Sequence, residues 1–440
     1  MSHAPIETGS PKERVLVCGV LLPGQPTESG GPLSEAMALV GAAEGVVLGE
    51  PHFQKRERAV PATLIGRGKV EELHELVTAL CPDAVVVDND LSPAQGRNLE
   101  KAWGCRVIDR SELILDIFSR RAQTRQARLQ VELAQLVYLA PRLRRMWTHL
   151  ERTEGAIGTR GPGETQLETD KRLLSKRVSD LKHELKHIEN RKQREVASRS
   201  EEFTVGLVGY TNAGKSTLLN RLTGSTEFAA DMPFATLDTR TRRWKLPDGR
   251  SVLLSDTVGF LQRLPHHLVA SFHATLEETL QADMLVHVVD AAHPDASHHL
   301  NAVDEVMTEL SPRLSAEILL LNKVDAVEDP LELQLLVEGR PEDVVYASAK
   351  TGVGLDLLIA RVAKRLDERS SLVDLWVPVT DGRTVARIRQ LGVIDEEALT
   401  DDGQELRIRV RLSDAVLGSL QATASAGLRV VPIEHDAASA

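Results

Sequence analysis

Cysteine, aromatic residues and long apolar runs are scarce in this chain. Its 440 residues include three cysteines, Cys18, Cys81 and Cys105, which lie far apart and form no close pair. This usage argues against a disulfide framework or a zinc site and is typical of a reducing compartment. The chain opens on a polar stretch without a hydrophobic signal core, and no apolar run approaches the length of a membrane span. We therefore expect a cytoplasmic protein without a membrane span.

A phosphate-binding loop, Gly-Tyr-Thr-Asn-Ala-Gly-Lys-Ser-Thr, occupies residues 209–217. It follows a short apolar run at 203–208, which predicts a buried strand, and it precedes leucines at helical spacing. In that context backbone N–H groups surround a pyrophosphate, and the helix N-terminus adds partial positive charge. Lys215 is expected to reach the β- and γ-phosphates, and Ser216 to ligate Mg²⁺. The loop residues that we predict to bind the nucleotide are Gly209, Tyr210, Thr211, Asn212, Ala213, Gly214, Lys215, Ser216 and Thr217.

A second motif, Asp256-Thr-Val-Gly259, follows another apolar run at 251–254. An aspartate at such a strand end can hold Mg²⁺ through water, and the glycine can offer its backbone N–H to the γ-phosphate. Many related enzymes place a glutamine directly after this motif to orient the attacking water. Phe260 stands there instead and cannot hydrogen-bond to water, which predicts slow unaided hydrolysis and a partner that supplies the missing group. The nearby alternatives for positioning the water are Gln262, which would need an unusual loop path, and His266 and His267, which are otherwise solvated.

Two short motifs predict recognition of guanine. Asn322-Lys-Val-Asp325 and Ala347-Ser-Ala-Lys350 each follow a run that predicts a strand. The Asp325 carboxylate can accept hydrogen bonds from N1 and N2 of guanine, whereas adenine leaves it unpaired, and such a site discriminates by up to roughly 10⁴-fold. The backbone of the second motif is placed to meet the guanine O6. The residues predicted to contact the base are Asn322, Lys323, Asp325, Ser348, Ala349 and Lys350.

Taken in order, these motifs resemble those of the Ras-like GTPase superfamily. The resemblance places the remaining switch motif at Phe234-Ala-Thr-Leu-Asp238, with Phe234 beside the nucleotide. It implies that the hydroxyl and carbonyl of Thr236 sense Mg²⁺ and the γ-phosphate; a solvated loop threonine is the alternative. The residues to which we assign catalytic roles are Lys215, Thr236 and Gly259, and the Mg²⁺ ligands are Ser216, Thr236 and Asp256.

The order of predicted elements indicates an α/β protein of several domains. A disordered tail (1–12) precedes an N-terminal α/β domain (13–110), and a long antiparallel helical hairpin (111–200) follows. A Ras-like P-loop G domain (201–369) and a small α+β C-terminal domain (370–440) complete the chain. The length agrees with about three domains of ordinary size.

The hairpin is set apart by its charge. The net charge of the chain is −11, yet residues 110–200 carry 20 Lys and Arg against 12 Asp and Glu, which is +8 and leaves −19 for the rest. A basic segment inside an acidic protein is an electrostatic footprint for phosphates; a solvated pair of charged helices is the less favoured alternative. Its glycine-rich tip, residues 155–163, carries Arg160 and little bulk, which suits insertion into a narrow, phosphate-lined place.

Two weaker patterns leave alternatives open. Gly66-Arg-Gly-Lys69 resembles a phosphate-binding turn but lacks the spacing of a true phosphate loop, so a structural turn is favoured over a second nucleotide or RNA contact. In the C-terminal domain, apolar residues alternate with Arg407, Arg409 and Arg411, which predicts a strand with one apolar and one basic face. That basic face is either an RNA or protein contact or simply solvated.

Over nearly its whole length the chain resembles the HflX family of ribosome-associated GTPases. The family usually has a proline where Thr239 stands, which alters the stiffness of the switch loop. The family-specific stretches are residues 63–72, 88–95, 131–135, 158–168, 234–238 and 256–260.

The resemblance implies binding to the large ribosomal subunit, with the hairpin tip near the peptidyl-transferase region. It further implies dissociation of stalled or idle ribosomes, GTP hydrolysis stimulated by the ribosome, and a monomer off the ribosome. The alternative is a guanine-nucleotide signalling switch whose hairpin binds a protein. Aromatic content of 3%, which leaves few platforms for base stacking, mildly favours that alternative.

Overall fold

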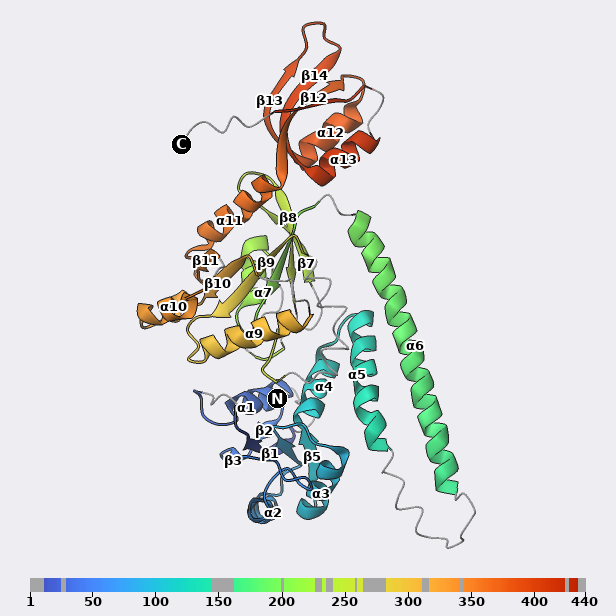
Figure 1. Cartoon of the computed structure of the whole chain (residues 1–440), viewed down its shortest axis with the longest axis vertical. Helices are drawn as coiled ribbons and strands as arrows, with labels where there is room; N and C mark the ends of the chain where they lie inside the picture. Colours follow the sequence, from blue (N-terminus) through green and yellow to red (C-terminus); the bar gives the residue numbers. More distant parts are fainter. Residues whose placement is uncertain are drawn as a thin grey trace, which may run out of the picture.

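The computed structural model describes residues 12–24, 29–143, 162–198, 202–225, 232–234, 240–257, 259–263, 282–310, 316–340, 343–423 and 427–433. Figure 1 shows an elongated molecule with the N-terminal unit at one end, the nucleotide-binding domain in the middle and a small sheet domain at the other end. A long helix, α6 (Pro162–Ser198), runs alongside the first two units. Among the described residues, no helix combines the length and the apolar character that crossing a membrane requires.

The N-terminal strands form one parallel sheet. They are β1 (Arg14–Leu21), β2 (Val46–Val47), β3 (His52–Lys55), β4 (Ala84–Val87) and β5 (Arg106–Asp109). Their order is β2-β1-β4-β5, and β3 also pairs with β1. Strands β1 and β4 are buried almost throughout because helices cover both faces of the sheet. The helices of this unit are α1 (Ser34–Ala42), α2 (Arg67–Leu80), α3 (Pro93–Trp103) and α4 (Arg110–Arg121).

Local sequence explains how these helices begin. Helix α3 has a capping box, in which Ser92 and Gln95 each bond the other's backbone N–H, and Pro93 stands at its first position. Helix α2 begins directly after Gly66, whose N–H donates to Gln54, and Lys69 pairs with Glu72 at 2.6 Å. The turn at 66–69 is therefore the structural start of a helix in this structure.

Helix α4 packs on the N-terminal sheet, although the sequence placed it in the hairpin. Leu113 and Ile117 of α4 share one core with Val15 and Val17 of β1. Helix α5 (Arg125–Leu143) contributes Val131 to the same core. The hairpin is thus rooted in the N-terminal unit, and the boundary at residue 110 stays a prediction.

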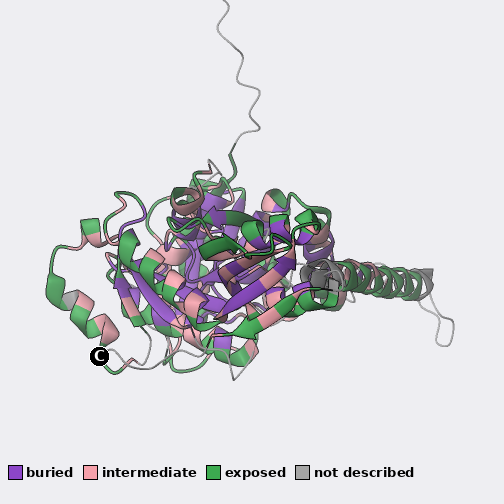
Figure 2. Ribbon diagram, turned by 90° about the horizontal axis from the view of Figure 1, so that it is seen from above, coloured by how far each residue is buried: buried purple, intermediate pink, exposed green. Residues whose placement is uncertain are grey.

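Helices α5 and α6 form the two arms of the hairpin. Leu181 of α6 is fully buried against Leu129 and Leu133 of α5, and Arg177 makes a two-bond ion pair with Glu132 at 2.7 and 2.8 Å. Helix α6 starts at Pro162, inside the predicted tip, because proline is favoured at the first helical position. Figure 2 shows α6 standing off from the body with exposed residues along it. Most of the predicted tip, including Arg160, lies outside the described residues.

The central domain is a mixed sheet of the order β11-β10-β9-β6-β8-β7, in which β7 alone is antiparallel to its neighbour within the described residues. Its strands are β6 (Thr204–Val208), β7 (Arg240–Lys245), β8 (Ser251–Asp256), β9 (Met284–Asp290), β10 (Ile318–Asn322) and β11 (Asp343–Tyr346). Its helices are α7 (Lys215–Thr223), α9 (Ala296–Leu310), α10 (Pro330–Val337), α11 (Leu355–Glu368) and the short 3₁₀ helix η1 (Val324–Ala326). The predicted motifs follow β6, β8, β10 and β11, so the parallel arrangement brings them to one edge of the sheet.

The C-terminal domain is an antiparallel sheet with two helices. It consists of β12 (Ser370–Pro378), α12 (Gly382–Leu391), β13 (Val393–Leu399), β14 (Glu405–Ser413), α13 (Asp414–Thr423) and β15 (Arg429–Pro432). The strand order is β13-β14-β12-β15. The α/β architecture with an α+β C-terminal unit agrees with the prediction.

Candidate nucleotide-binding site

The phosphate-binding loop joins β6 to α7, and two of its glycines are required by close contacts. A Cβ on Gly209 would lie 2.2 Å from the Val288 carbonyl oxygen of β9. A Cβ on Gly214, whose φ is +94°, would lie 2.2 Å from Nδ2 of Asn322. The loop is therefore held tightly against the neighbouring strands, which keeps its backbone N–H groups at the start of α7.

Lys215, the predicted phosphate-binding lysine, is buried inside this loop. Its ammonium donates to the carbonyl oxygens of Gly209 at 2.9 Å and Tyr210 at 2.7 Å. Burial lowers the pKa of Lys215 to about 8, and the Asp256 carboxylate opposes part of that shift. The ammonium is thus held at the centre of the loop, where a phosphate would restore its preference for the charged form.

Two predicted Mg²⁺ ligands meet at the start of α7. The Ser216 hydroxyl donates to Oδ2 of Asp256 at 2.5 Å. Hydroxyl and carboxylate oxygens are the ligands that Mg²⁺ takes beside nucleotide phosphates, so this pair fits the ion. The third predicted ligand, Thr236, lies outside the described residues, and Phe234 before it is fully buried with its ring edge-on to Phe118 at 4.6 Å.

Gly259 and Phe260 lie directly over the phosphate-binding loop. A Cβ on Gly259 would lie 2.7 Å from Cα of Thr211 and 3.1 Å from the Lys215 ammonium, so only glycine fits. The Phe260 N–H donates to the Gly209 carbonyl at 3.1 Å, and the Thr211 N–H donates to the Phe260 carbonyl at 2.8 Å. The Phe260 ring is buried, so the residue in the glutamine position serves the core. His266 and His267 lie outside the described residues.

On the base side, Asn322 connects the two loops that would surround a guanine. Its Nδ2 donates to the Ala213 carbonyl at 2.8 Å, and its Oδ1 accepts from the Ala349 N–H at 2.9 Å. Lys323 has a left-handed backbone (φ 62°) and pairs with Asp290 at 2.7 Å. This bridging role of Asn322 was not predicted from the sequence.

The other predicted base-side residues differ in burial. Asp325 is exposed in η1, where its carboxylate can face a ligand. Ser348 is buried and its hydroxyl accepts from the Thr351 N–H at 3.1 Å, which fixes the loop that carries Ala349. Lys350 is exposed. The structure thus brings the phosphate loop, Asp256 and both base motifs to one edge of the sheet.

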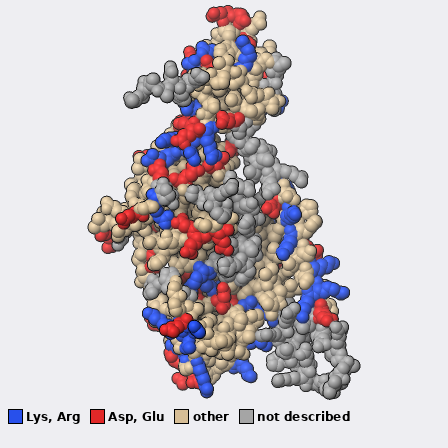
Figure 3. Space-filling model, in the orientation of Figure 1, with Lys and Arg blue, Asp and Glu red and all other residues tan. Residues whose placement is uncertain are grey.

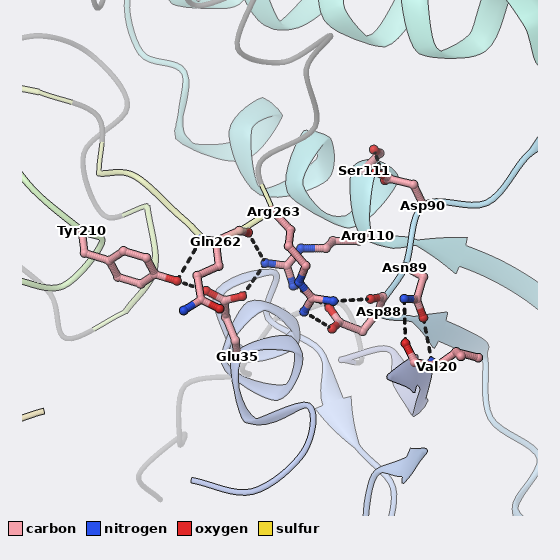
Figure 4. Close-up of polar contacts among 10 residues, drawn as sticks. All are labelled: Val20, Glu35, Asp88, Asn89, Asp90, Arg110, Ser111, Tyr210, Gln262 and Arg263. Carbon is pink, nitrogen blue, oxygen red and sulfur yellow. Dashed lines mark hydrogen bonds and ion pairs between the residues drawn. The ribbon is translucent and has the colours of Figure 1, made fainter. Parts of the chain in front are cut away.

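A buried polar network that the sequence did not reveal joins this site to the N-terminal unit (Figure 4). The Tyr210 hydroxyl donates to Glu35 of α1 and accepts from the Gln262 N–H at 2.9 Å. Arg110 of α4 is buried, pairs with Glu35 and with Asp88 at 2.5 Å, and donates to the Gln262 carbonyl at 2.8 Å. Burial disfavours the charge of Arg110, but the two carboxylates outweigh it and raise its pKa.

Arg263 adds a second ion pair to this network. It pairs with the other oxygen of Asp88 at 2.6 Å. Residues 259–263, which follow the Asp256 motif, are therefore tied to the N-terminal unit through Gln262 and Arg263. No sequence pattern predicted this network, because Tyr210 and Glu35 are 175 positions apart and Arg110 and Gln262 are 152 apart.

A cavity of about 430 Å³ adjoins the phosphate-binding loop on this side. Its wall includes Tyr210, Asn212 and Gln262 from the nucleotide-binding domain and Glu35 from α1. His299 of α9 stacks on Tyr210 with ring centroids 3.8 Å apart. Burial and the neighbouring His293 lower the pKa of His299 to about 4, so its imidazole is neutral at physiological pH.

Family models match most of the chain. The GTP-binding GTPase N-terminal model matches residues 31–119, and the GTP-binding GTPase Middle Region model matches residues 121–199. A model described as 50S ribosome-binding GTPase matches residues 204–323.

Individual proteins are also similar to this chain over most of its length. GTPase HflX of Escherichia coli (strain K12) is 45% identical over 87% of this chain and 90% of its own length. GTPase HflX of Magnetococcus marinus is 40% identical over 94% of this chain and 96% of its own length. A solved GTP-binding protein of Sulfolobus solfataricus in complex with GDP is 24% identical over 80% of this chain and 98% of that one, with a TM-score of 0.40. Because the two GTPase HflX proteins are 45% and 40% identical to this chain over most of its length and of their own, the chain belongs to the HflX family of GTPases, which bind GTP and hydrolyse it.

Proposed function

We propose that the protein binds the large ribosomal subunit in the cytoplasm, splits stalled or idle ribosomes, and hydrolyses GTP rapidly only on that subunit. Off the ribosome it is a slow GTPase and a monomer. The observation that carries this proposal is Phe260, which is buried and bonded through its backbone to the phosphate-binding loop. A phenyl ring cannot orient the attacking water, so the group that does so comes from a partner or from a partner-induced rearrangement.

The nucleotide roles follow from the contacts around Lys215 and Ser216. The Lys215 ammonium exchanges its two carbonyl partners for β- and γ-phosphate oxygens, and backbone N–H groups of the loop hold the pyrophosphate. Ser216 and Asp256 hold Mg²⁺, which when bound neutralises phosphate charge. Gly259 offers its N–H to the γ-phosphate, and Asp325 reads the guanine edge.

Two further observations support a ribosomal partner. Lys and Arg residues gather along α6, on the arm that stands off from the body (Figure 3). Their side chains can neutralise RNA phosphates without base-specific contacts. The match of residues 204–323 to a model described as 50S ribosome-binding GTPase points to the same partner.

Turnover of GTP with and without purified large subunits tests the proposal. We expect subunits to accelerate hydrolysis by at least about 100-fold, within the range of partner activation in such enzymes. Lys215→Ala should abolish nucleotide retention and turnover, whereas Lys245→Ala, an exposed lysine of β7 in the same domain, should behave as wild type. The absence of acceleration at any subunit concentration would refute ribosome-stimulated hydrolysis.

Sedimentation with ribosomes and a non-hydrolysable GTP analogue distinguishes this function from a protein-binding switch. Binding through phosphates weakens steeply with salt, because each neutralised phosphate steepens the dependence. A flat salt response would instead favour the signalling switch whose hairpin binds a protein. Ribosome splitting is measured in a separate experiment, as the conversion of 70S particles into free subunits in a density gradient.

A further inference from the structure

The C-terminal domain has the chain order β-α-β-β-α-β, which is the ferredoxin-like arrangement. Alternate residues of β12 and β14, among them Leu375 and Val410, are buried together with Ile388 of α12 and Leu420 of α13. Both helices therefore pack on the same face of the sheet, and Figure 1 shows them on one side of it. The opposite face, which we call the open face, carries the other set of alternate residues.

Arginine side chains flank a tryptophan on the open face. Trp376 of β12 lies in register with Arg407 of β14 on one side and Arg429 of β15 on the other. Each guanidinium carbon lies 5.6 Å from the centre of the Trp376 ring. Arg409 and Arg411 extend the row along β14.

A buried carboxylate sets the orientation of two of these arginines. Asp374 of β12 is only 5% exposed and accepts hydrogen bonds from Arg407 at 2.6 Å and from Arg409 at 3.0 and 3.2 Å. Burial opposes ionisation of Asp374, but the two arginines outweigh it and lower its pKa. Because Asp374 lies beneath them, the guanidinium groups keep a fixed position on the face while about a third of each side chain is exposed.

The remaining ion pairs of these arginines are either long or exposed. Arg409 lies 3.6 Å from Glu396 and Arg411 lies 3.9 Å from Asp367, and Arg429, which is 64% exposed, pairs with Glu405. Exposed pairs of this kind contribute little to stability, so a phosphate can replace the carboxylate. Arginine also suits that exchange, because its planar fork binds phosphate through two hydrogen bonds and stacks on flat rings.

The arginine row is not a by-product of a basic domain. Residues 370–440 contain seven arginines, no lysine and eleven acidic residues, a net charge of −4. Four of the seven arginines lie on the open face, the set just described. Arginine side chains, each paired with a carboxylate, are therefore concentrated around an aromatic ring in a unit that is acidic as a whole.

We propose that the open face of the C-terminal domain binds a segment of unpaired RNA. One base stacks on Trp376, and the phosphates on either side bind Arg409, Arg411 and Arg429. Four-stranded sheets of this topology bind single-stranded RNA through aromatic side chains on their central strands, where β12 and β14 lie here. The inference rests on the proposed function in one respect, since ribosomal RNA is then the source of the unpaired segment.

Photocross-linking locates the contact on the full-length protein without interference from the basic hairpin. A ten-nucleotide RNA that contains 4-thiouridine should cross-link within residues 370–378 or 405–413, as mapped by mass spectrometry. Trp376→Leu should reduce that cross-link and the affinity by roughly tenfold, because stacking on one aromatic ring is lost. Trp376→Phe keeps a ring and should restore most of the cross-link, which separates stacking from a folding defect.

Arginine substitutions test the phosphate contacts. Arg411→Gln and Arg429→Gln should each make the salt dependence of binding shallower by about 0.7 in log–log slope, the value for one phosphate of a single strand. The matched control is Arg389→Gln on α12, which is 54% exposed, pairs with Glu397 and lies on the helical side. It should leave the cross-link and the slope unchanged.

Several outcomes would overturn the proposal. These are a cross-link confined to residues 111–200, equal losses in Arg389→Gln and Arg411→Gln, tighter binding of a ten-base-pair RNA duplex, or capture of an acidic peptide in preference to RNA. Sedimentation with large subunits is scored independently. A protein that cross-links as expected but does not sediment would contradict the proposed function alone, and the reverse result would contradict this inference alone.

Discussion

The two halves of the nucleotide site are supported in different ways. On the base side, Asn322 bonds Ala213 and Ala349, so residues of one domain hold each other in place. On the phosphate side, Tyr210 and Gln262 bond Glu35 and Arg110 of the N-terminal unit. The nucleotide-binding domain therefore holds its two predicted base motifs together by its own contacts, whereas the loop that follows Asp256 also contacts the N-terminal unit.

Removal of Arg110, which supports the phosphate side of the site, should lower the stability of the protein more than any other change considered below. Arg110→Ala leaves the buried Glu35 without its cation and leaves Asp88 with Arg263 alone, so the free energy of unfolding should fall by about 3–5 kcal/mol. Urea unfolding followed by circular dichroism measures it. Arg106→Ala, which removes an exposed arginine paired with Glu112 at 3.0 Å, should cost less than about 1 kcal/mol. Equal losses in the two variants would show that the buried network does not stabilise the fold.

Asn322→Ala tests the base side of the site through the affinity for GDP. It removes two buried hydrogen bonds and leaves the Ala213 carbonyl and the Ala349 N–H without this partner, so GDP affinity should fall by about 3 kcal/mol, or roughly 100-fold. Calorimetric titration with GDP measures it. Asn98→Ala, which removes one exposed hydrogen bond to Ala62 in the N-terminal unit, is the control and should bind GDP normally. An unchanged affinity in Asn322→Ala would refute the bridging role.

Tyr210→Phe separates the two hydrogen bonds of the Tyr210 hydroxyl, of which the one to Glu35 crosses to the N-terminal unit, from the stacking of its ring. The ring still stacks on His299, but the bonds to Glu35 and Gln262 are lost, so we expect a loss of about 1–2 kcal/mol in the free energy of unfolding. GDP affinity should stay within about threefold of wild type if the base side is independent. Tyr346→Phe at an exposed tyrosine supplies the control. A large loss of GDP affinity would show that the two sides are coupled.

Acid should lower the stability of the folded protein through protonation of His299, which stacks on Tyr210 beside the phosphate-binding loop. Its pKa of about 4 lies below the ordinary 6.5, so the folded state binds fewer protons than the unfolded chain between those values. Stability should be retained above pH 6.5 and fall as the pH drops toward 4, by about 1 kcal/mol after allowance for partial exposure. His299→Gln should flatten this pH profile, and His298→Gln at the exposed neighbour should not. Identical profiles in all three proteins would exclude His299 as the cause.

The motifs could be predicted because each one is local. A phosphate-binding loop between a strand and a helix fixes where Lys215 and Ser216 lie, and the contact between Ser216 and Asp256 follows from neighbouring parallel strands. The network of Arg110, Glu35 and Tyr210 could not be predicted, because no spacing in the sequence links residues so far apart. The roles of Thr236 and of the hairpin tip stay predictions.

Strand β14 of the C-terminal domain shows again that the sequence predicts local features but not contacts between distant residues. Alternation along β14 predicted an apolar face and a basic face, and Ile408 and Val410 are indeed buried. The carboxylate of Asp374 that orients Arg407 and Arg409 became visible only from the pairing of β12 with β14. Sequence periodicity identifies the face that a side chain occupies, and strand register identifies its neighbours.

The long helix α6 has a mechanical consequence. Its 37 residues span about 55 Å at the rise of an α-helix. It ends at Ser198, and β6, the strand that enters the phosphate-binding loop, begins at Thr204. A stiff rod that ends so close in sequence to β6 acts as a lever: a push on its far end reaches the edge of the sheet where β6 begins, opposite the edge that carries the phosphate-binding loop.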